Sequence, residues 1–371
     1  AHEDHIGAVP YLYPKLGKIP IYTTSFTASV LKRKFESVGI KEFNINLFEY
    51  NKKFTIGSFQ VEIFSLTHSI PEPNAIALRT KLGTVVHTGD FKIDHTPVDN
   101  KAADLQRLGE LGREGVLLLL SDSTYAEVPG YTPSEKTVTE TLDWVINKST
   151  GRVLVATFAS LISRVQQIVD VAFKHNRKVS LVGRSMVNNI TMSVSKGYLK
   201  APSNTIIPLD QLNSLPSESQ LIVLTGAQGE PLSVLSRIAN SRHREISISE
   251  GDTVIISATP IPGNEVAVAS VIDGLVRQGA KVITRRSLPG VHVPGHASQE
   301  ELKLMLRLLT PKYFIPIHGE YRMLVAHSEL AREVGIPPQN IFVIQDGDVL
   351  NLTQNKAEIV DTVPTDDILI D

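Results

Sequence analysis

Hydrophobic positions are spaced differently in the first third of the chain and in its middle. In the first third, short apolar runs with irregular connections predict strands at residues 54–56, 59–65, 75–80 and 84–87. From residue 151 onward, each short apolar run precedes a longer segment with helical spacing. The predicted strands there are 153–157, 179–182, 221–224, 253–256 and 281–284, and the predicted helices are 162–174, 186–198, 232–239 and 265–277. Such alternation implies a parallel sheet covered by helices.

Small and polar residues follow the predicted strands of this middle region. The loops begin at Phe158, Gly183, Thr225 and Ser257. They lie at the carboxyl ends of parallel strands, where open α/β sheets place their ligand crevice. The glycines of any single loop can simply close a tight turn. Four such loops at one end of a sheet favour a shared site for an anion such as phosphate.

Composition narrows the class of protein. A length of 371 residues exceeds one typical domain, so we expect two lobes. A hydrophobic content of 42% excludes disordered, collagen-like and coiled-coil chains. The apolar runs are shorter than the ~18 residues of a membrane span, so we expect a soluble protein with no membrane partner. The net charge of −2 gives no sign of a nucleic-acid partner.

Cysteine is absent, which excludes a disulfide framework and a thiol nucleophile. Any bound metal must therefore be held by imidazole and carboxylate groups. The candidate ligands are His2, Asp4 and His5 at the start of the chain, and His68, Asp90 and His318, each just after an apolar run. Each histidine taken singly is more typical of a surface or satisfied core residue than of a metal ligand. The set as a whole favours a metal site.

This set resembles the metallo-β-lactamase fold and, within it, the β-CASP nucleic-acid hydrolases. The first motif of that family is His-x-His-x-Asp-His, and His2, Asp4 and His5 match its second half. The first histidine of the motif would precede residue 1. We therefore expect the chain to be a fragment that lacks the start of the N-terminal lobe and the C-terminal domain. The remaining motif matches are His68, Asp90, Asp122, His296 and His318.

Longer strings narrow the resemblance to the ribonuclease J family across residues 1–371. They include Ser121-Asp122-Ser123-Thr124, Gly183-Arg184-Ser185-Met186 and His292-Val293-Pro294-Gly295-His296. One loop departs from the family pattern. Where the family has Phe-Ala-Ser-Asn-x-His-Arg, this chain has Phe158-Ala159-Ser160-Leu161-Ile162-Ser163-Arg164, without the amide and the imidazole. A catalytically impaired RNA-binding or scaffold subunit is therefore an alternative interpretation.

The resemblance implies an α/β fold, namely an αββα metallo-β-lactamase sandwich with an inserted parallel α/β β-CASP domain. The implied domains are 1–135 and 300–371, which form the two parts of the metallo-β-lactamase domain, and 136–299, which forms the insert. It also implies two Zn²⁺ ions, with Mn²⁺ as an alternative. His2 and His68 would bind one ion, Asp4, His5 and His318 the other, and Asp90 both. Two such ions, ~3.5–4 Å apart, activate a hydroxide that attacks a phosphodiester.

Catalytic and substrate roles follow from the same resemblance. Asp90, His296 and Asp122 are the implied catalytic residues, with His296 giving a proton to the departing ribose oxygen and Asp122 orienting it. Asp122 could instead cap the following turn. The implied substrate contacts are Ser160, Arg184, Ser185, His292, Val293, Pro294, Gly295 and His296. For Arg184, a salt bridge between the lobes is an alternative.

The implied activity is that of a metal-dependent ribonuclease, combining 5′→3′ exonuclease and endonuclease action in the processing and decay of RNA, including rRNA. Single-stranded RNA would bind through its backbone, and the full-length protein would be a homo-oligomer, a dimer or a tetramer. Hydrolysis of a small thioester or lactam is disfavoured, because such a substrate has no use for the large insert. The acidic end with Asp366, Asp367 and Asp371 could bind a further structural cation or be a solvated tail.

Overall fold

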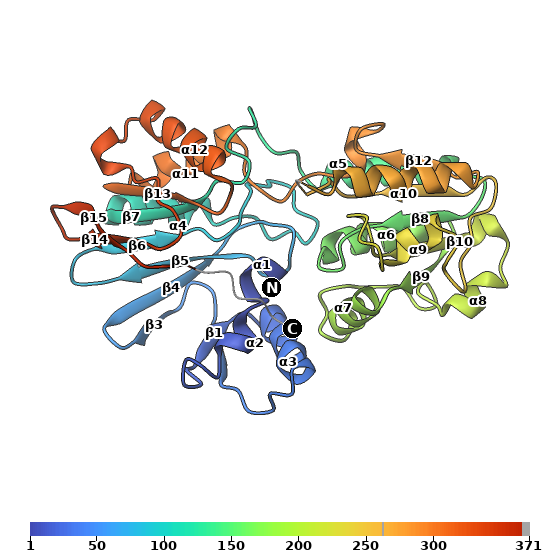
Figure 1. Ribbon diagram of the computed structural model, residues 1–371, viewed down its shortest axis with the longest axis horizontal. Coiled ribbons are helices and arrows are strands. Elements are labelled where there is room, and N and C mark those ends of the chain that lie inside the picture. Colours follow the sequence, from blue (N-terminus) through green and yellow to red (C-terminus); the bar gives the residue numbers. More distant parts are fainter. Residues whose placement is uncertain (262, 366–371) are drawn as a thin grey trace.

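Two sheets organise the chain, and each forms the centre of its own lobe (Figure 1). The structure is a computed structural model that describes residues 1–261 and 263–365. The first lobe contains a six-stranded sheet of order β13-β7-β6-β5-β4-β3. The second contains a five-stranded sheet of order β12-β11-β8-β10-β9.

The six-stranded sheet is parallel on one side and antiparallel on the other. Its strands are β3 (Lys53–Ile56), β4 (Phe59–Ser65), β5 (Asn74–Arg79), β6 (Thr84–His87), β7 (Val116–Asp122) and β13 (Tyr313–Ile317). Strands β3 to β6 form an antiparallel meander, whereas β6, β7 and β13 run parallel. The carboxyl ends of these three parallel strands therefore meet at one edge of the sheet.

Helices cover one face of this sheet, and a hairpin covers the other. The helices are α4 (Leu105–Glu114), α11 (Gln299–Leu309) and α12 (Tyr321–Glu333), and the hairpin strands are β14 (Asp348–Leu352) and β15 (Ala357–Thr362). Successive side chains of a strand point to opposite faces. Leu119 and Phe314 accordingly pack against the helices, while Leu118 and Ile315 pack against the hairpin.

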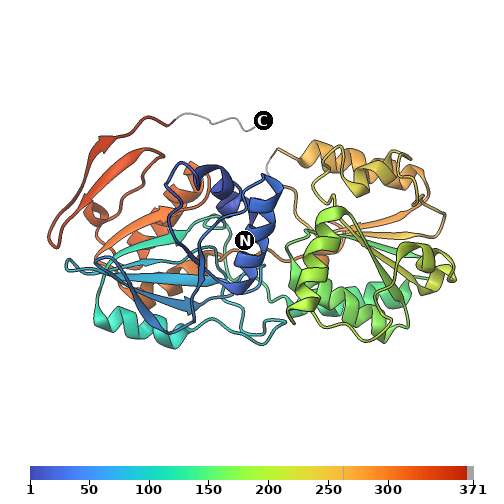
Figure 2. The same ribbon diagram turned by 90° about the horizontal axis from the view of Figure 1, so that it is seen from below.

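A small N-terminal unit lies between the lobes (Figure 2). Its elements are α1 (Glu3–Ile6), α2 (Val9–Leu12), β1 (Ile21–Thr23), α3 (Ser25–Ser37) and β2 (Ile45–Leu47). Tyr13, Leu31 and Phe35 form its own apolar cluster. Phe26, from the same helix α3, is instead buried in the core of the second lobe. The unit thus holds the start of the chain against both lobes.

The second lobe is a parallel sheet with helices on both faces. Its strands are β8 (Val153–Ala156), β9 (Lys178–Val182), β10 (Gln220–Leu224), β11 (Thr253–Ile256) and β12 (Lys281–Thr284). Its helices are α5 (Lys136–Lys148), α6 (Ile162–Lys174), α7 (Arg184–Ser195), α8 (Leu209–Asn213), α9 (Val234–Ala239) and α10 (Glu265–Arg277). Helices α5 to α7 share one core with Val153 and Val155, and α8 to α10 share another with Leu154 and Ala156.

The predicted alternation and the predicted α/β fold class are both confirmed. Strand β11 and helices α6 and α10 have the predicted bounds, whereas α9 begins two residues later than predicted because Ser233 caps it. Three short 3₁₀ turns, Ser217–Ser219, Pro289–Val291 and Pro338–Asn340, complete the chain. In the described ranges no helix combines the length and apolar character of a membrane span.

The domain limits can be related to packing. Val138, early in α5, is buried in the core of the second lobe, as is Val293. Ala297 and Leu302 belong to the core of the first lobe. We propose domain limits of 1–135, 136–299 and 300–371. The chain enters the core of the second lobe by Val138 and leaves it between Val293 and Ala297, just before the second limit.

Candidate metal centre

Three parallel strands of the first lobe deliver candidate residues to one edge of the sheet. Asp90 follows β6, Asp122 ends β7, and His318 follows β13. Asp122 pairs with Ile317 in the register of β7 and β13, so His318 emerges beside it. His318 has φ of +56°, a conformation that side chains other than glycine rarely adopt and that often marks a functional constraint.

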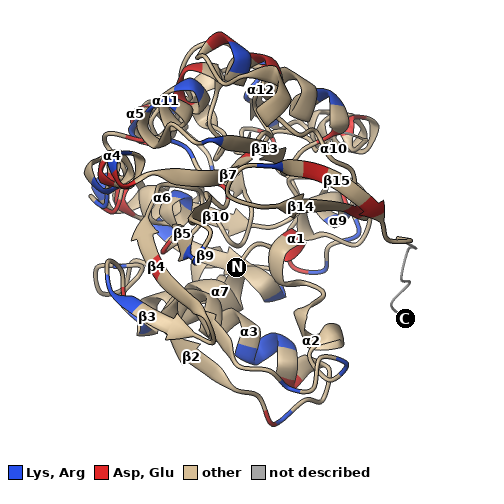
Figure 3. Ribbon diagram, turned by 90° about the vertical axis from the view of Figure 1, so that its left-hand side faces the viewer, with Lys and Arg blue, Asp and Glu red and all other residues tan. Residues whose placement is uncertain are grey.

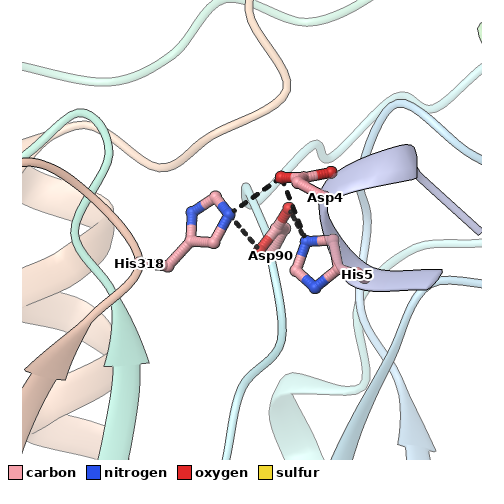
Figure 4. Close-up of side chains that lie close together, drawn as sticks. All are labelled: Asp4, His5, Asp90 and His318. Atoms are coloured by element: carbon pink, nitrogen blue, oxygen red, sulfur yellow. Dashed lines mark hydrogen bonds and ion pairs between the residues drawn. The ribbon is translucent and has the colours of Figure 1, made fainter. Parts of the chain in front are cut away.

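Asp4, His5, Asp90 and His318 form a compact group, which we call the four-residue cluster (Figure 4). Each offers one ligand atom, and these atoms all lie within 4.8 Å of one another. Nε2 of His5 is 2.8 Å from Oδ2 of Asp90, and Nε2 of His318 is 3.2 Å from Oδ2 of Asp4. Imidazole nitrogens and carboxylate oxygens suit zinc or manganese. The donor set of the cluster therefore fits a divalent cation.

Charge within the cluster is unevenly distributed. Hydrogen bonds to Asp122 and Asp4 raise the pKa of His318 to about 10, and the bond to Asp90 raises the pKa of His5. The same contact with His318 lowers the pKa of Asp4. The carboxylates thus favour the protonated form of these imidazoles, and a bound divalent cation would replace the protons.

His2 and His68, which we call the histidine pair, lie beside the cluster in a drier environment. Their ring centroids are 5.1 Å apart. Burial is the main reason that the pKa falls to about 4 for His2 and about 3 for His68. Both imidazoles are therefore neutral at pH 7, which is the form that binds metal. Nε2 of His68 is 3.7 Å from Oδ2 of Asp90. Among the described residues, two groups of candidate ligands lie close enough together to hold a metal ion, and neither includes His2 or His68.

Hydrogen bonds to the second ring nitrogen orient two of the candidate ligands. Nδ1 of His68 is 2.8 Å from the carbonyl oxygen of Gly295. Nδ1 of His318 is 2.8 Å from Oγ1 of Thr124. Such contacts fix the ring and direct Nε2 toward the site, where it now contacts Asp4 in His318 and the hydroxyl of Ser69 in His68. Sequence reasoning did not single out Thr124, although it stands in the family string with Asp122.

His296 lies between the cluster and the pair. Its Nδ1 is 2.7 Å from Oδ2 of the buried Asp122, and its ring centroid is 5.0 Å from that of His68 and 5.6 Å from that of His318. Burial opposes protonation of His296, but the adjacent charge of Asp122 raises its pKa. Oδ1 of Asp122 also accepts the N–H of Thr124 at 3.0 Å. Asp122 therefore both caps its turn and orients His296.

The second lobe contributes one predicted contact to this site. Oγ of Ser160, in the loop between β8 and α6, is 3.4 Å from Nδ1 of His2. Arg184 and Ser185 begin α7 and are exposed. Within the described part of the chain, Arg184 has no ion-pair partner, so the alternative of a salt bridge between the lobes is not observed.

The loop at 292–296 is mostly internal. His292 and Val293 are 7% and 4% exposed, and Pro294 is buried as well. The buried guanidinium of Arg164 lies 3.4 Å from His292 and 2.8 Å from the carboxylate of Glu135. These three predicted substrate contacts thus pack inside the protein, and the loop is more open only at Gly295 and His296. The pattern of the sequence does not distinguish such packing residues from binding residues.

Two predicted features lie outside the described residues. They are Pro262, in the loop that follows β11, and the acidic end with Asp366, Asp367 and Asp371.

Comparisons with known proteins point to one family. Residues 150–275 match the family model of the ribonuclease J β-CASP domain, and residues 290–343 match a Zn-dependent metallo-hydrolase RNA specificity domain. The whole chain is 48% identical to ribonuclease J of Synechocystis sp. over 372 residues, and 44% identical to ribonuclease J of Thermus thermophilus over 377 residues. The chain belongs to the ribonuclease J family. Ribonuclease J2 of Bacillus subtilis is 42% identical over 372 residues.

The match covers all of this chain but only part of the relatives. The chain spans 58% of the Synechocystis protein, 65% of the Thermus protein and 66% of the Bacillus protein. A crystal structure of a protein of unknown function from Enterococcus faecalis has the same fold, with a TM-score of 0.61 at 15% identity. That likeness covers 92% of this chain and 76% of the other.

Proposed function

We propose that the protein is a metal-dependent ribonuclease that hydrolyses phosphodiester bonds of single-stranded RNA, by 5′→3′ exonuclease and endonuclease action. The observation that carries the proposal is the convergence of the four-residue cluster with the His296–Asp122 pair. The cluster collects its residues from α1 and from the ends of β6 and β13. Such an arrangement suits chemistry that uses both a bound metal ion and proton transfer.

The proposed cofactors are two divalent cations, zinc or manganese. The four-residue cluster would hold one, and His2 and His68 with Asp90 would hold the other. Two bound divalent ions would supply an activated water and would stabilise the charge on the phosphodiester oxygens. An additional structural cation at the acidic end is a further proposal.

His296 is the proposed proton donor, and Asp122 its positioning partner. If Nδ1–H donates to Asp122, the second ring nitrogen carries the transferable proton. The raised pKa of His296 favours a protonated ring near neutral pH. The departing ribose oxygen would take this proton.

Ser160, Arg184 and Ser185 are the proposed RNA contacts of the second lobe, and Gly295 and His296 those of the loop beside the metals. We expect binding through the phosphate backbone, with the exposed guanidinium of Arg184 as the charged contact. His292, Val293 and Pro294 would act through the packing of that loop. We place the activity in RNA processing and decay, including rRNA, in the cytoplasm, with a homodimer or homotetramer as the working form.

The test is cleavage of a fluorescently labelled single-stranded RNA by the protein that carries this chain, in the presence of Zn²⁺ or Mn²⁺. We expect cleavage to stop on addition of a chelator and in Asp90→Ala. Asp210→Ala, an exposed aspartate in α8, is the matched control and should cleave normally. Cleavage that survives chelation or Asp90→Ala would contradict the two-metal proposal. RNA binding without cleavage in the metal-loaded protein would favour the scaffold alternative.

A further inference from the structure

Glu301 is a fully buried carboxylate at the third residue of α11. It accepts three hydrogen bonds from backbone N–H groups: Oε1 from Ile93 at 2.7 Å, and Oε2 from Thr132 at 2.6 Å and from Ser298 at 2.9 Å. Hydrogen bonds to a charged acceptor are roughly twice as strong as neutral ones. Glu301 therefore ties together three segments that lie far apart in the sequence.

Two of these segments carry the candidate catalytic residues. Ile93 lies three residues after Asp90, and Ser298 lies two residues after His296. The third segment reaches the same loop directly, because the hydroxyl of Thr132 donates to the carbonyl oxygen of His296 at 2.7 Å. Glu301 thus connects the backbone of the metal-ligand loop to that of the proton-donor loop without touching either functional side chain.

Helix capping explains only part of this arrangement. Ser298 and Glu301 form a capping box at the start of α11. In that motif the glutamate side chain accepts one hydrogen bond, from the backbone N–H of the N-cap residue, here Ser298. The bonds to Ile93 and Thr132 are additional, and both partners belong to other segments. A residue that served the helix alone would not need them.

We propose that Glu301 is a positioning residue that fixes the placement of His296 relative to Asp90, an inference that rests on the proposed function. In the reaction, a water molecule gives one proton to solvent and its oxygen forms the new bond to phosphorus. The bond from phosphorus to the ribose oxygen breaks, and that oxygen takes the proton of His296, which His296 regains from solvent. Displacement of the His296 loop slows this proton transfer. Metal binding by Asp4, His5, Asp90 and His318 does not depend on it.

The decisive variant is Glu301→Gln, which replaces one acceptor oxygen by an amide NH₂ that must face a backbone N–H. On RNA we expect kcat to fall about 10- to 100-fold with KM unchanged, since small displacements of catalytic groups cost that much. The second substrate is thymidine 5′-(p-nitrophenyl) phosphate, whose leaving group departs without a proton. There we expect most of the loss to disappear. His296→Ala should show the same contrast, whereas Asp90→Ala should abolish both reactions.

A matched control separates positioning from stability. Asp104 caps α4, which packs beside α11, through a hydrogen bond from the N–H of Arg107 at 2.9 Å. Asp104→Ala should lower the melting temperature and leave both rates unchanged. If Glu301→Gln does not fold, Thr132→Val serves in its place, because it removes the hydroxyl bond to His296 and keeps the backbone N–H. It must then show the same contrast between substrates.

Two results would overturn the inference while the proposed function stands. One is wild-type activity of Glu301→Gln on RNA, and the other is an equal loss on both substrates. A metal-loaded wild-type protein that cleaves neither substrate would instead refute the proposed function, and the inference with it.

Discussion

The two halves of the candidate metal centre, the four-residue cluster and the histidine pair, are built on different principles. In the four-residue cluster, two carboxylates lie among two imidazoles, and the histidines have raised pKa values. In the histidine pair, burial dominates and the pKa values of both imidazoles are depressed. Asp90 is the residue that approaches both, at 2.8 Å from His5 and 3.7 Å from His68.

This difference predicts an order of metal binding. The cluster offers negative charge and converging ligand atoms, so it should bind a cation first and release protons on doing so. The pair offers neutral ligands that need no deprotonation but contribute no charge, and it should bind second and more weakly. The four-residue cluster thus depends on electrostatic attraction, and the histidine pair on desolvated, preoriented rings.

The largest expected effect follows removal of His318. His318→Ala takes one ligand from the cluster, and we expect loss of the tightly bound ion together with an activity loss of several kcal/mol, roughly 10³-fold or more. His2→Ala is the matched variant in the histidine pair and should keep the first ion. Metal content by mass spectrometry and the RNA cleavage rate report both. Loss of the same first ion in the two variants would erase the proposed distinction between the halves.

A smaller effect should follow a change directed at the histidine pair. A Cβ at Gly295 would lie 2.8 Å from Cε1 and 2.9 Å from Nδ1 of His68, so Gly295→Ala must displace that ring. We expect the second metal ion to bind about 10- to 100-fold more weakly while the first is unaffected. Calorimetric titration with Zn²⁺ measures the two affinities.

The control for this variant is Gly109→Ala in α4, where the nearest atom to the added Cβ is 3.9 Å away. It should leave both affinities unchanged. A weakened first site in Gly295→Ala would mean that the two halves are not separable.

The smallest effect concerns His327, a buried histidine linked through Ser123 to the backbone of His318. His327 is fully buried, and its Nδ1 is 2.9 Å from Oγ of Ser123, whose backbone N–H donates to the carbonyl oxygen of His318. Burial lowers the pKa of His327 from 6.5 to about 3. Between these values the unfolded chain binds the proton and the folded chain does not. The contribution of His327 to the free energy of unfolding is therefore fully present above pH 6.5. It falls as the pH drops, by up to about 1.4 kcal/mol per pH unit.

Urea unfolding at pH 7 and pH 5 measures this effect in the wild type and in His327→Gln. The variant should lose the part of this difference that His327 contributes, because an amide does not titrate, while His2 and His68 keep their own contributions. His95→Gln, at an exposed histidine, should behave as the wild type. An unchanged pH dependence in His327→Gln would assign the acid sensitivity to other groups.

Much of the fold could be predicted from local pattern. In the second lobe, the strand that became β11 and the helices that became α6 and α10 had their bounds correctly predicted, because apolar periodicity and flanking turn residues act over a few positions. Glu301 shows the limit. Its capping-box spacing from Ser298 is visible in the sequence, but its partners Ile93 and Thr132 are brought to it only by folding.

The sequence predicted which residues are candidates for the site, but it did not predict how buried each one is or what it contacts. Motif matching selected His292 together with His296, since both stand in the same string. Folding buries His292 beside Arg164 and leaves His296 next to Asp122. Burial depends on contacts between segments far apart in the sequence, which no local spacing reveals.

By itself, the sequence determined the chemistry available to this protein. The absence of cysteine, together with histidines and aspartates at strand ends, restricted any metal site to imidazole and carboxylate ligands. The longer sequence motifs, such as the one from His292 to His296, indicated the family. Only the tertiary structure decided which of these ligands converge. The parallel pairing of β6, β7 and β13 aligns Asp90, Asp122 and His318 at one edge, and the packing of α1 between the lobes adds Asp4 and His5. Convergence is set by sheet register and lobe packing, which arise from many distant contacts at once.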